Sequence, residues 1–168
     1  NKNSFQVISL RFATLFGLSP RMRFDLGVNT MTKNILQGKS IMVNGDGKQY
    51  RSFVHVKDVA ASIKFFLNHK KKLNHKIYNI GSKINNVKII ELARLFKKIF
   101  LNLKIKKNLK NYDFRSYEVN FDRLSKIMNN NNFVTLEEGI KEIFNYYKNK
   151  KINYNNNIYY NLQIVKSK

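Results

Sequence analysis

The sequence contains no cysteine among its 168 residues. This absence excludes disulfides, thiolate zinc sites and cysteine nucleophiles. The three histidines, His55, His69 and His75, show no metal-ligand spacing such as HExxH, so we expect no metal site. No apolar run approaches the roughly 18 to 20 residues that a membrane helix requires, and no secretory signal opens the chain. We therefore expect no membrane partner and a cytoplasmic protein.

Acidic residues are scarce: 10 Asp and Glu stand against 32 Lys and Arg, and the net charge is +22. Such a charge alone would suggest a polyanion as partner. The basic residues, however, are 25 Lys and only 7 Arg, and 25 Asn accompany them, which indicates a bias toward AT-rich codons. The only short basic runs are KKK at 70–72 and KIKK at 104–107. We therefore regard nucleic acid as an unlikely partner and keep a basic nucleic-acid-binding module as the alternative function.

The first half of the chain alternates strand and helix patterns. Residues 5–16, FQVISLRFATLF, form an apolar run rich in aromatic and β-branched residues, which predicts a strand buried on both faces. A helical pattern covers 26–36, and Gly38 can end that helix. A short strand follows at 40–43. The turn residues NGDG at 44–47 then predict a hairpin with the segment behind them.

The second half repeats this alternation. Asp58 can cap a helix, and KIYNIGS at 76–82 predicts another buried strand. Asn85 or Asn86 can cap a strongly periodic helix that extends to about Phe100. Thr135 and Glu138 form a capping box for a last helix. The alternation predicts an α/β fold, and the low-complexity tail from about residue 149 predicts disorder.

Five segments in order resemble the C-terminal portion of the NAD-dependent nucleotide-sugar epimerase/dehydratase family, the extended short-chain dehydrogenases. They are LRFATLFG at 10–17, GDGKQYRSFVHVKDVA at 45–60, YNIG at 78–81, DFRSYEVNFDRLSKI at 113–127 and TLEEGIKEI at 135–143. The resemblance implies an α/β fold over residues 1–148: the C-terminal part of a Rossmann-type parallel sheet, interleaved with a small α/β substrate-binding subdomain. Residues 149–168 would form a separate tail.

The resemblance also implies a function. Family members bind NAD or NADP mainly on an N-terminal half, oxidise a nucleoside-diphosphate sugar by hydride transfer, usually at C4, and are usually homodimers. The chain has no counterpart of the glycine-rich GxxGxxG loop, and the catalytic Tyr-x-x-x-Lys group is expected ahead of residue 1. Literal matches at Tyr146 and Lys150, and at Tyr147 and Lys151, lie in a stretch where chance matches abound. We therefore expect no catalytic residue here, and an inactive remnant of the family is a further alternative.

The substrate-binding residues follow from the same resemblance. Arg51 matches an arginine that approaches the nucleotide diphosphate, and a planar guanidinium suits phosphate oxygens. Asp113 and Arg115 match a D-x-R segment that closes over the nucleotide from the other side. Asn29 aligns with a position near the phosphates, or is an ordinary polar helix residue. Arg23 could contact the sugar or phosphate, or anchor its loop.

The cofactor-binding residues are expected at the end of the first strand. Phe12, Ala13 and Thr14 match positions near the nicotinamide, although Thr14 stands where many relatives carry Asn. His55 and Asp58 also match the family. We interpret Asp58 as the helix cap and His55 as a semi-buried residue between sheet and helix.

Overall fold

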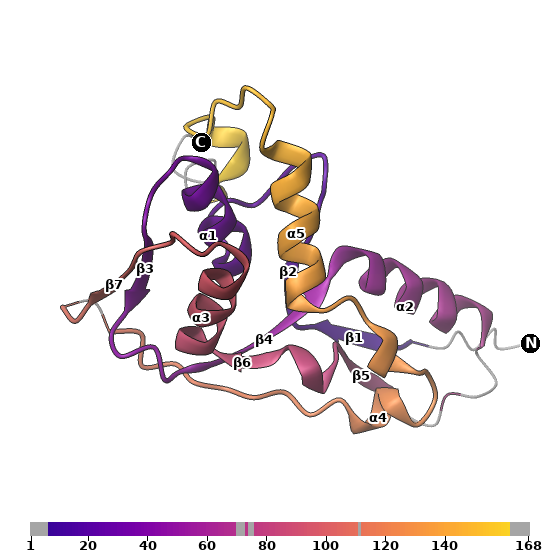
Figure 1. The fold of residues 1–168 in the computed structure, drawn as a ribbon. Helices are drawn as coiled ribbons and strands as arrows, with labels where there is room; N and C mark the ends of the chain where they lie inside the picture. The colour runs from indigo at the N-terminus through magenta and orange to yellow at the C-terminus, as the bar shows by residue number, and fades with distance from the viewer. Residues whose placement is uncertain (1–6, 70–72, 74–75, 111, 162–168) are drawn as a thin grey trace, which may run out of the picture.

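The computed structural model describes residues 7–69, 73, 76–110 and 112–161. This part of the chain is a mixed α/β fold with parallel strands, as the sequence predicts (Figure 1). Strands β3 and β7 lie at one end with helices α1 and α3, and strands β1 and β5 lie at the other end beside α2. None of the helices in the described residues is long and apolar enough to cross a membrane.

The first predicted strand is two strands in the structure. Strand β1 (Ser9–Phe12) pairs in parallel with β5 (Ile77–Ile80), whereas β2 (Thr14–Phe16) pairs in parallel with β4 (Tyr50–His55). Between them, the backbone N–H of Ala13 donates to the carbonyl of Ile80 at 3.0 Å. The prediction of one continuous strand over 5–16 is wrong because the chain changes its hydrogen-bonding partner at Ala13. Residues 1–6 of that prediction lie outside the described residues.

The predicted hairpin is also wrong. Strand β3 (Ile41–Asn44) pairs in parallel with the distant β7 (Ile105–Asn108). Strand β4 pairs with β2 through its second half and pairs antiparallel with β6 (Asn86–Lys88) through its first half. The turn itself is present. Gly45 and Gly47 have φ of 66° and 75°, values that favour glycine, and the turn directs the chain from one sheet to another.

The helices are α1 (Gly27–Leu36), α2 (Val56–Asn68), α3 (Ile89–Ile99), the single turn α4 (Asp122–Ser125) and α5 (Leu136–Tyr147), with 3-10 turns η2 (Lys83–Asn85), η3 (Asn130–Asn132) and η4 (Asn157–Tyr159). Helix α1 ends as predicted, because Gly38 adopts φ 67° just beyond it. The capping box of α5 is confirmed: Thr135 Oγ1 accepts the Glu138 N–H at 3.2 Å, and Glu138 Oε2 accepts the Thr135 N–H at 2.8 Å.

Two helices begin elsewhere than predicted. Helix α2 begins at Val56, and its cap is His55, whose Nδ1 accepts the Lys57 N–H at 3.3 Å. Asp58 lies inside the first turn and instead accepts the N–H of Val134 at 2.9 Å. Helix α3 begins only at Ile89, because the three residues ahead of it are used as strand β6.

Three apolar clusters stabilise these elements. The first joins α1, α3 and α5 to β3 and β4, and includes Phe16, Phe53 and Phe96. The second lies where β1 and β5 meet α2 and α4, and includes Tyr78 and Phe121. Burial of such side chains contributes roughly 1.5 to 3 kcal/mol each relative to exposure.

The third cluster corrects the predicted tail. Met22, Phe24, Ile143 and Tyr147 form its buried centre, and side chains beyond residue 149 pack against it: Ile152, Tyr154, Tyr159 and Tyr160. The sequence predicts a separate, disordered tail from about residue 149, but these four residues pack on the cluster, because the tyrosines supply apolar surface that a count of Asn and Lys hides. Residues 162–168 lie outside the described part.

Candidate functional site

A cavity of about 520 Å³ lies between the beginning of α1, strands β3 and β4, and the segment around residues 113–117. We call it the Arg51 cavity. Its volume falls within the range of about 300 to 1,000 Å³ that is usual for ligand sites. The cavity is lined by Thr14, Asp25, Leu26, Gly27, Thr30, Met31, Asn34, Met42, Asn44, Gln49, Arg51, Phe53, Ile89, Asp113, Arg115 and Tyr117.

Strand β4 places Arg51 in this cavity. Arg51 and Phe53 are two residues apart, so they face the same side of the strand, and both line the cavity. The Arg51 side chain is only 13% exposed, and its Nη1 donates to the carbonyls of Tyr50 at 2.7 Å and Arg115 at 2.5 Å. Its guanidinium carbon also lies 5.0 Å from the centre of the Tyr117 ring. Arg51 is therefore held in place before any ligand binds.

Asp113 joins Arg51 to Arg115. One carboxylate oxygen, Oδ2, lies 2.6 Å from Arg51 Nη2 and 3.0 Å from Arg115 Nη2, while Oδ1 lies 2.9 Å from Arg115 Nε. The hydrogen bond from Arg115, together with the charge of Arg51, holds the pKa of Asp113 well below its usual range. The structure thus brings together Arg51, Asp113 and Arg115, as the sequence predicts, and the group carries a net charge of +1.

The segment that carries Asp113 and Arg115 is attached to β4 by its backbone and by Ser116. The Tyr117 N–H donates to the Tyr50 carbonyl at 3.4 Å, and the Tyr50 N–H donates to Ser116 Oγ at 3.0 Å. Farther along, the Val119 N–H donates to Ser52 Oγ at 3.2 Å. These contacts position alternate residues 113, 115 and 117 on the cavity side.

The other predicted substrate residues lie apart from this group. Arg23 donates two hydrogen bonds of 2.7 and 2.8 Å to Asp25, which lines the cavity. Arg23 itself does not line the cavity, whose guanidinium groups come from Arg51 and Arg115. Asn29 is buried on α1, and its Oδ1 has no hydrogen-bond partner among the described residues. The cavity side of α1 is formed by Thr30 and Asn34 instead.

The predicted cofactor residues divide in the same way. Thr14 lines the Arg51 cavity, whereas Ala13 is buried at the point where the chain passes from one sheet to the other. Phe12 is 42% exposed. Of the three, only Thr14 contributes to the cavity wall.

Sequence reasoning missed Tyr117 as a site residue. Its ring lies over the Arg51 guanidinium, and a cation over an aromatic face is stabilised by the ring quadrupole. The signal was present, because Asp113, Arg115 and Tyr117 alternate, which is the period of an extended segment. The acidic Asp25 and the amides of Asn34, Asn44 and Gln49 were also missed, and no local motif distinguishes them from the many other polar residues of the chain.

The literal Tyr-x-x-x-Lys matches have unsuitable surroundings for catalysis. Tyr147 is buried, and burial raises its pKa to about 12. A tyrosine that acts as a general acid and base needs the opposite shift, toward neutral pH. At the other match, Lys150 Nζ lies over the ring of Tyr146, 3.3 Å from its centre, so the ammonium contacts the ring face.

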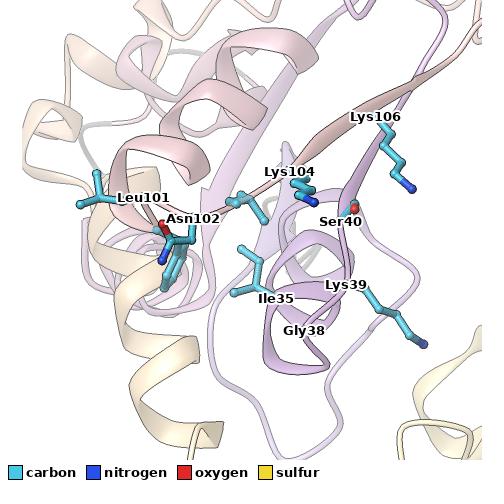
Figure 2. Close-up of a pocket in the computed structure, with 10 residues that line it drawn as sticks. Ile35, Gly38, Lys39, Ser40, Leu101, Asn102, Lys104 and Lys106 are labelled. Atoms are coloured by element: carbon cyan, nitrogen blue, oxygen red, sulfur yellow. The ribbon is translucent and has the colours of Figure 1, made fainter.

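A second cavity, of about 700 Å³, lies away from all the predicted site residues. It is lined by Ile35, Gly38, Lys39, Ser40, Phe100, Leu101, Asn102, Leu103, Lys104 and Lys106, and in Figure 2 the three ammonium groups lie on the same side of Ile35. Helices α1 and α3 both end here, and lysines near helix C-termini complement the partial negative charge of the last carbonyl groups. These lysines therefore have a structural explanation, and the Arg51 cavity is the stronger candidate site.

Acidic and histidine side chains do not gather into a metal centre in the part of the chain that the structure describes: no group of three or more His, Asp or Glu there could hold a metal ion. The site residues of the Arg51 cavity instead favour an anion, because two guanidinium groups face one carboxylate. Planar guanidinium forks match phosphate oxygens in geometry as well as charge.

Comparison with known proteins gives consistent matches. The model of the NAD dependent epimerase/dehydratase family matches residues 1–81. A UDP-glucuronate 4-epimerase of Thermodesulfobacterium geofontis (strain OPF15) is 28% identical over 142 residues, covering 83% of this chain and 42% of the relative. An uncharacterized UDP-glucose epimerase of Bacillus subtilis (strain 168) is 37% identical over 82 residues, covering 48% of this chain and 25% of the relative.

Solved structures match the fold. The UDP-glucuronic acid 4-epimerase from Bacillus cereus, in complex with UDP-glucuronic acid and NAD, gives a TM-score of 0.69 at 23% identity, covering 84% of this chain and 45% of that structure. The NAD-dependent NDP-hexosamine 5,6-dehydratase TunA gives a TM-score of 0.72 at 19% identity, covering 88% and 47%. The chain therefore spans less than half the length of these relatives.

Proposed function

Because residues 1–81 match the model of the NAD dependent epimerase/dehydratase family, we propose that the chain belongs to this family and that its Arg51 cavity grips the diphosphate of a nucleoside-diphosphate sugar. The observation that carries the proposal is the meeting of Arg51 and Arg115 in one cavity, with their guanidinium groups converging on a single carboxylate. Two guanidinium forks in one wall can donate hydrogen bonds to two phosphoryl groups at once.

The complete protein would act as an epimerase or dehydratase that transfers a hydride at the sugar, usually at C4. Bound NAD or NADP would supply the nicotinamide that accepts and returns the hydride. This chain's own task would be to bind the substrate and orient the sugar. Arg51 would fix the phosphates, because its position is already set by two backbone carbonyls.

The residues present fit only one end of such a cofactor. None of the seven glycines forms a GxxGxxG loop for the pyrophosphate, so the dinucleotide would be held mainly by residues outside this chain. Thr14 fits the nicotinamide end, because it lines the Arg51 cavity at the start of β2. We propose that Thr14, next to the strand change at Ala13, lies where the sugar and the nicotinamide meet.

Arg51→Lys tests this proposal. A lysine keeps the charge but loses the planar fork, so we expect UDP binding to weaken by roughly 1 to 3 kcal/mol in isothermal titration calorimetry. In the complete protein, NAD binding should stay nearly unchanged. The control is Arg94→Lys, because Arg94 is exposed on α3 and lies outside the cavity. An unchanged UDP dissociation constant in Arg51→Lys would remove Arg51 from the site.

The alternative of a basic nucleic-acid-binding module predicts different behaviour. Binding carried by the +22 charge would accept any DNA and would collapse steeply as salt is added. A nucleotide-sugar site predicts that UDP is preferred over a polyphosphate of equal charge, because base and ribose add contacts that depend on shape. Competition between the two ligands at one salt concentration decides between these functions.

A further inference from the structure

The Asp113 carboxylate makes the contacts that the proposed function assigns to phosphate. Its two oxygens accept hydrogen bonds from Nη2 of Arg51 and from Nε and Nη2 of Arg115, at 2.6 to 3.0 Å. These are the donors through which guanidinium groups bind phosphoryl oxygens. The unliganded cavity therefore already contains an anion, and that anion is part of the chain.

We propose that Asp113 is an autoinhibitory residue: an internal anion that a phosphate ligand must displace from Arg51 and Arg115 in order to bind. This inference rests on the proposed function of the Arg51 cavity. It adds that the site is closed by its own carboxylate until a phosphate ligand displaces it.

The structure allows the carboxylate to leave without unfolding its segment. Residues 112–121 have no regular secondary structure, and the Asp113 side chain is 29% exposed. The segment's attachments to β4 run through the Arg115 carbonyl, the Tyr117 N–H and Ser116 Oγ, and none of these uses the Asp113 side chain. Rotation of the Asp113 side chain therefore opens both guanidinium groups, and it also releases the Arg115 N–H that Asp113 Oδ1 accepts at 3.2 Å.

The cost to a ligand follows from the contacts that are exchanged. Displacing Asp113 breaks ion pairs with both Arg51 and Arg115. Because Asp113 is tethered beside the arginines, its effective concentration is high, and every phosphate ligand that uses both guanidinium groups meets the same displacement cost.

Asp113→Asn tests the inference, with UDP and UMP as probes in isothermal titration calorimetry. The amide removes the charge and with it the displacement cost, so both ligands should bind more tightly. We expect each to gain about tenfold, which is the factor for a cavity closed by Asp113 in about nine-tenths of the molecules.

Asp46→Asn is the matched control. It removes the same charge close to the cavity, in the turn after β3, but the carboxylate of Asp46 binds the Lys48 N–H rather than an arginine of the cavity. It should leave the dissociation constants of UDP and UMP unchanged. A general electrostatic effect of losing an acidic residue would instead shift both variants alike, which would overturn the inference.

The remaining outcomes separate the two proposals. Weaker or unchanged UDP and UMP binding in Asp113→Asn, with Arg51→Lys still impaired, would show that Asp113 positions the arginines or is inert, and would overturn only the autoinhibitory role. Absence of UDP binding in the wild type and in every variant would overturn the proposed function, and the autoinhibitory role with it.

Discussion

Gly17 has little freedom to vary, because two separate constraints act on it. Its φ of 112° lies where side chains are strained, and an added Cβ would overlap the imidazole of His55, which is fully buried. We expect Gly17→Ala to destabilise the protein by about 3 kcal/mol or more, since a buried ring must move. Urea unfolding of the purified variant measures this.

Gly38→Ala is the control for that prediction. Gly38 also has a positive φ, 67°, but nothing lies within 4 Å of its Cβ position. Backbone strain alone should therefore cost about 1 to 2 kcal/mol. Equal losses in the two variants would show that the contact with His55 does not limit position 17.

At the residue scale, three charged members of the candidate site were predicted from the sequence. Arg51, Asp113 and Arg115 match family motifs, and Arg51 also stands out as one of only 7 arginines beside 25 lysines. Asn29 could not be placed in this way, because one of 25 asparagines carries no such signal, and its buried Oδ1 becomes visible only in the structure. The binding roles of all these residues remain predictions.

Between elements, a polar contact ties the beginning of α2 to α5. His55 Nδ1 accepts the Lys57 N–H, so His55 Nε2 carries the proton and donates it to Glu142 Oε2 at 2.8 Å, and Lys57 Nζ also binds Glu142. Burial alone would raise the pKa of Glu142, but the hydrogen bonds from Lys57 and His55 outweigh it and lower that pKa. The ionised carboxylate is therefore favoured in the folded state.

The pH dependence follows with a definite sign. Because the folded pKa of Glu142 lies below its unfolded value of about 4.3, its stabilisation is complete above that value and is lost as the pH falls through the folded pKa. We expect Glu142→Gln to cost about 1 kcal/mol at pH 7, a low value because the carboxylate is partly open to water. The difference from wild type should shrink as the pH falls below 4, as urea titrations at each pH would show.

Glu137→Gln is the control on the same helix. Glu137 pairs with Lys141 one turn later, at 2.6 Å, and both are exposed. Such a surface pair contributes little, so this variant should resemble wild type at pH 7. A Glu142→Gln variant as stable as Glu137→Gln would show that the link between α2 and α5 is not stabilising.

The same elements show which parts of the fold the sequence determines locally. The capping box of Thr135 and Glu138 needs only contacts within four residues, and it was predicted correctly. The partner of β3 is β7, about 60 residues away, and no turn residue at 44–47 can specify it. Likewise, residues 86–88 could cap a helix or pair as a strand, and their choice depends on the edge that β4 offers.

At the scale of the whole molecule, residues 152–160 close an aromatic cluster around Phe24. Phe24, fully buried, meets the rings of Tyr147, Tyr154 and Tyr159 at centroid distances of 5.1 to 5.9 Å. Arg21 Nε also donates to the carbonyl of Ile158 at 2.7 Å, so the loop after β2 and the segment after α5 hold each other.

Tyr159→Ala tests whether this closure stabilises the entire fold. Removing the ring opens one side of Phe24, and we expect a loss of about 2 kcal/mol in the free energy of unfolding, the cost of a half-buried aromatic contact. Ile158→Ala is the control next to it, because Ile158 is 47% exposed and its backbone carbonyl still accepts from Arg21. Phe24 directly precedes Asp25, which lines the Arg51 cavity. Tyr159→Ala should therefore also weaken UDP binding at temperatures near the midpoint of its thermal unfolding. Equal stability of the two variants would mean that the segment lies on the cluster without stabilising it.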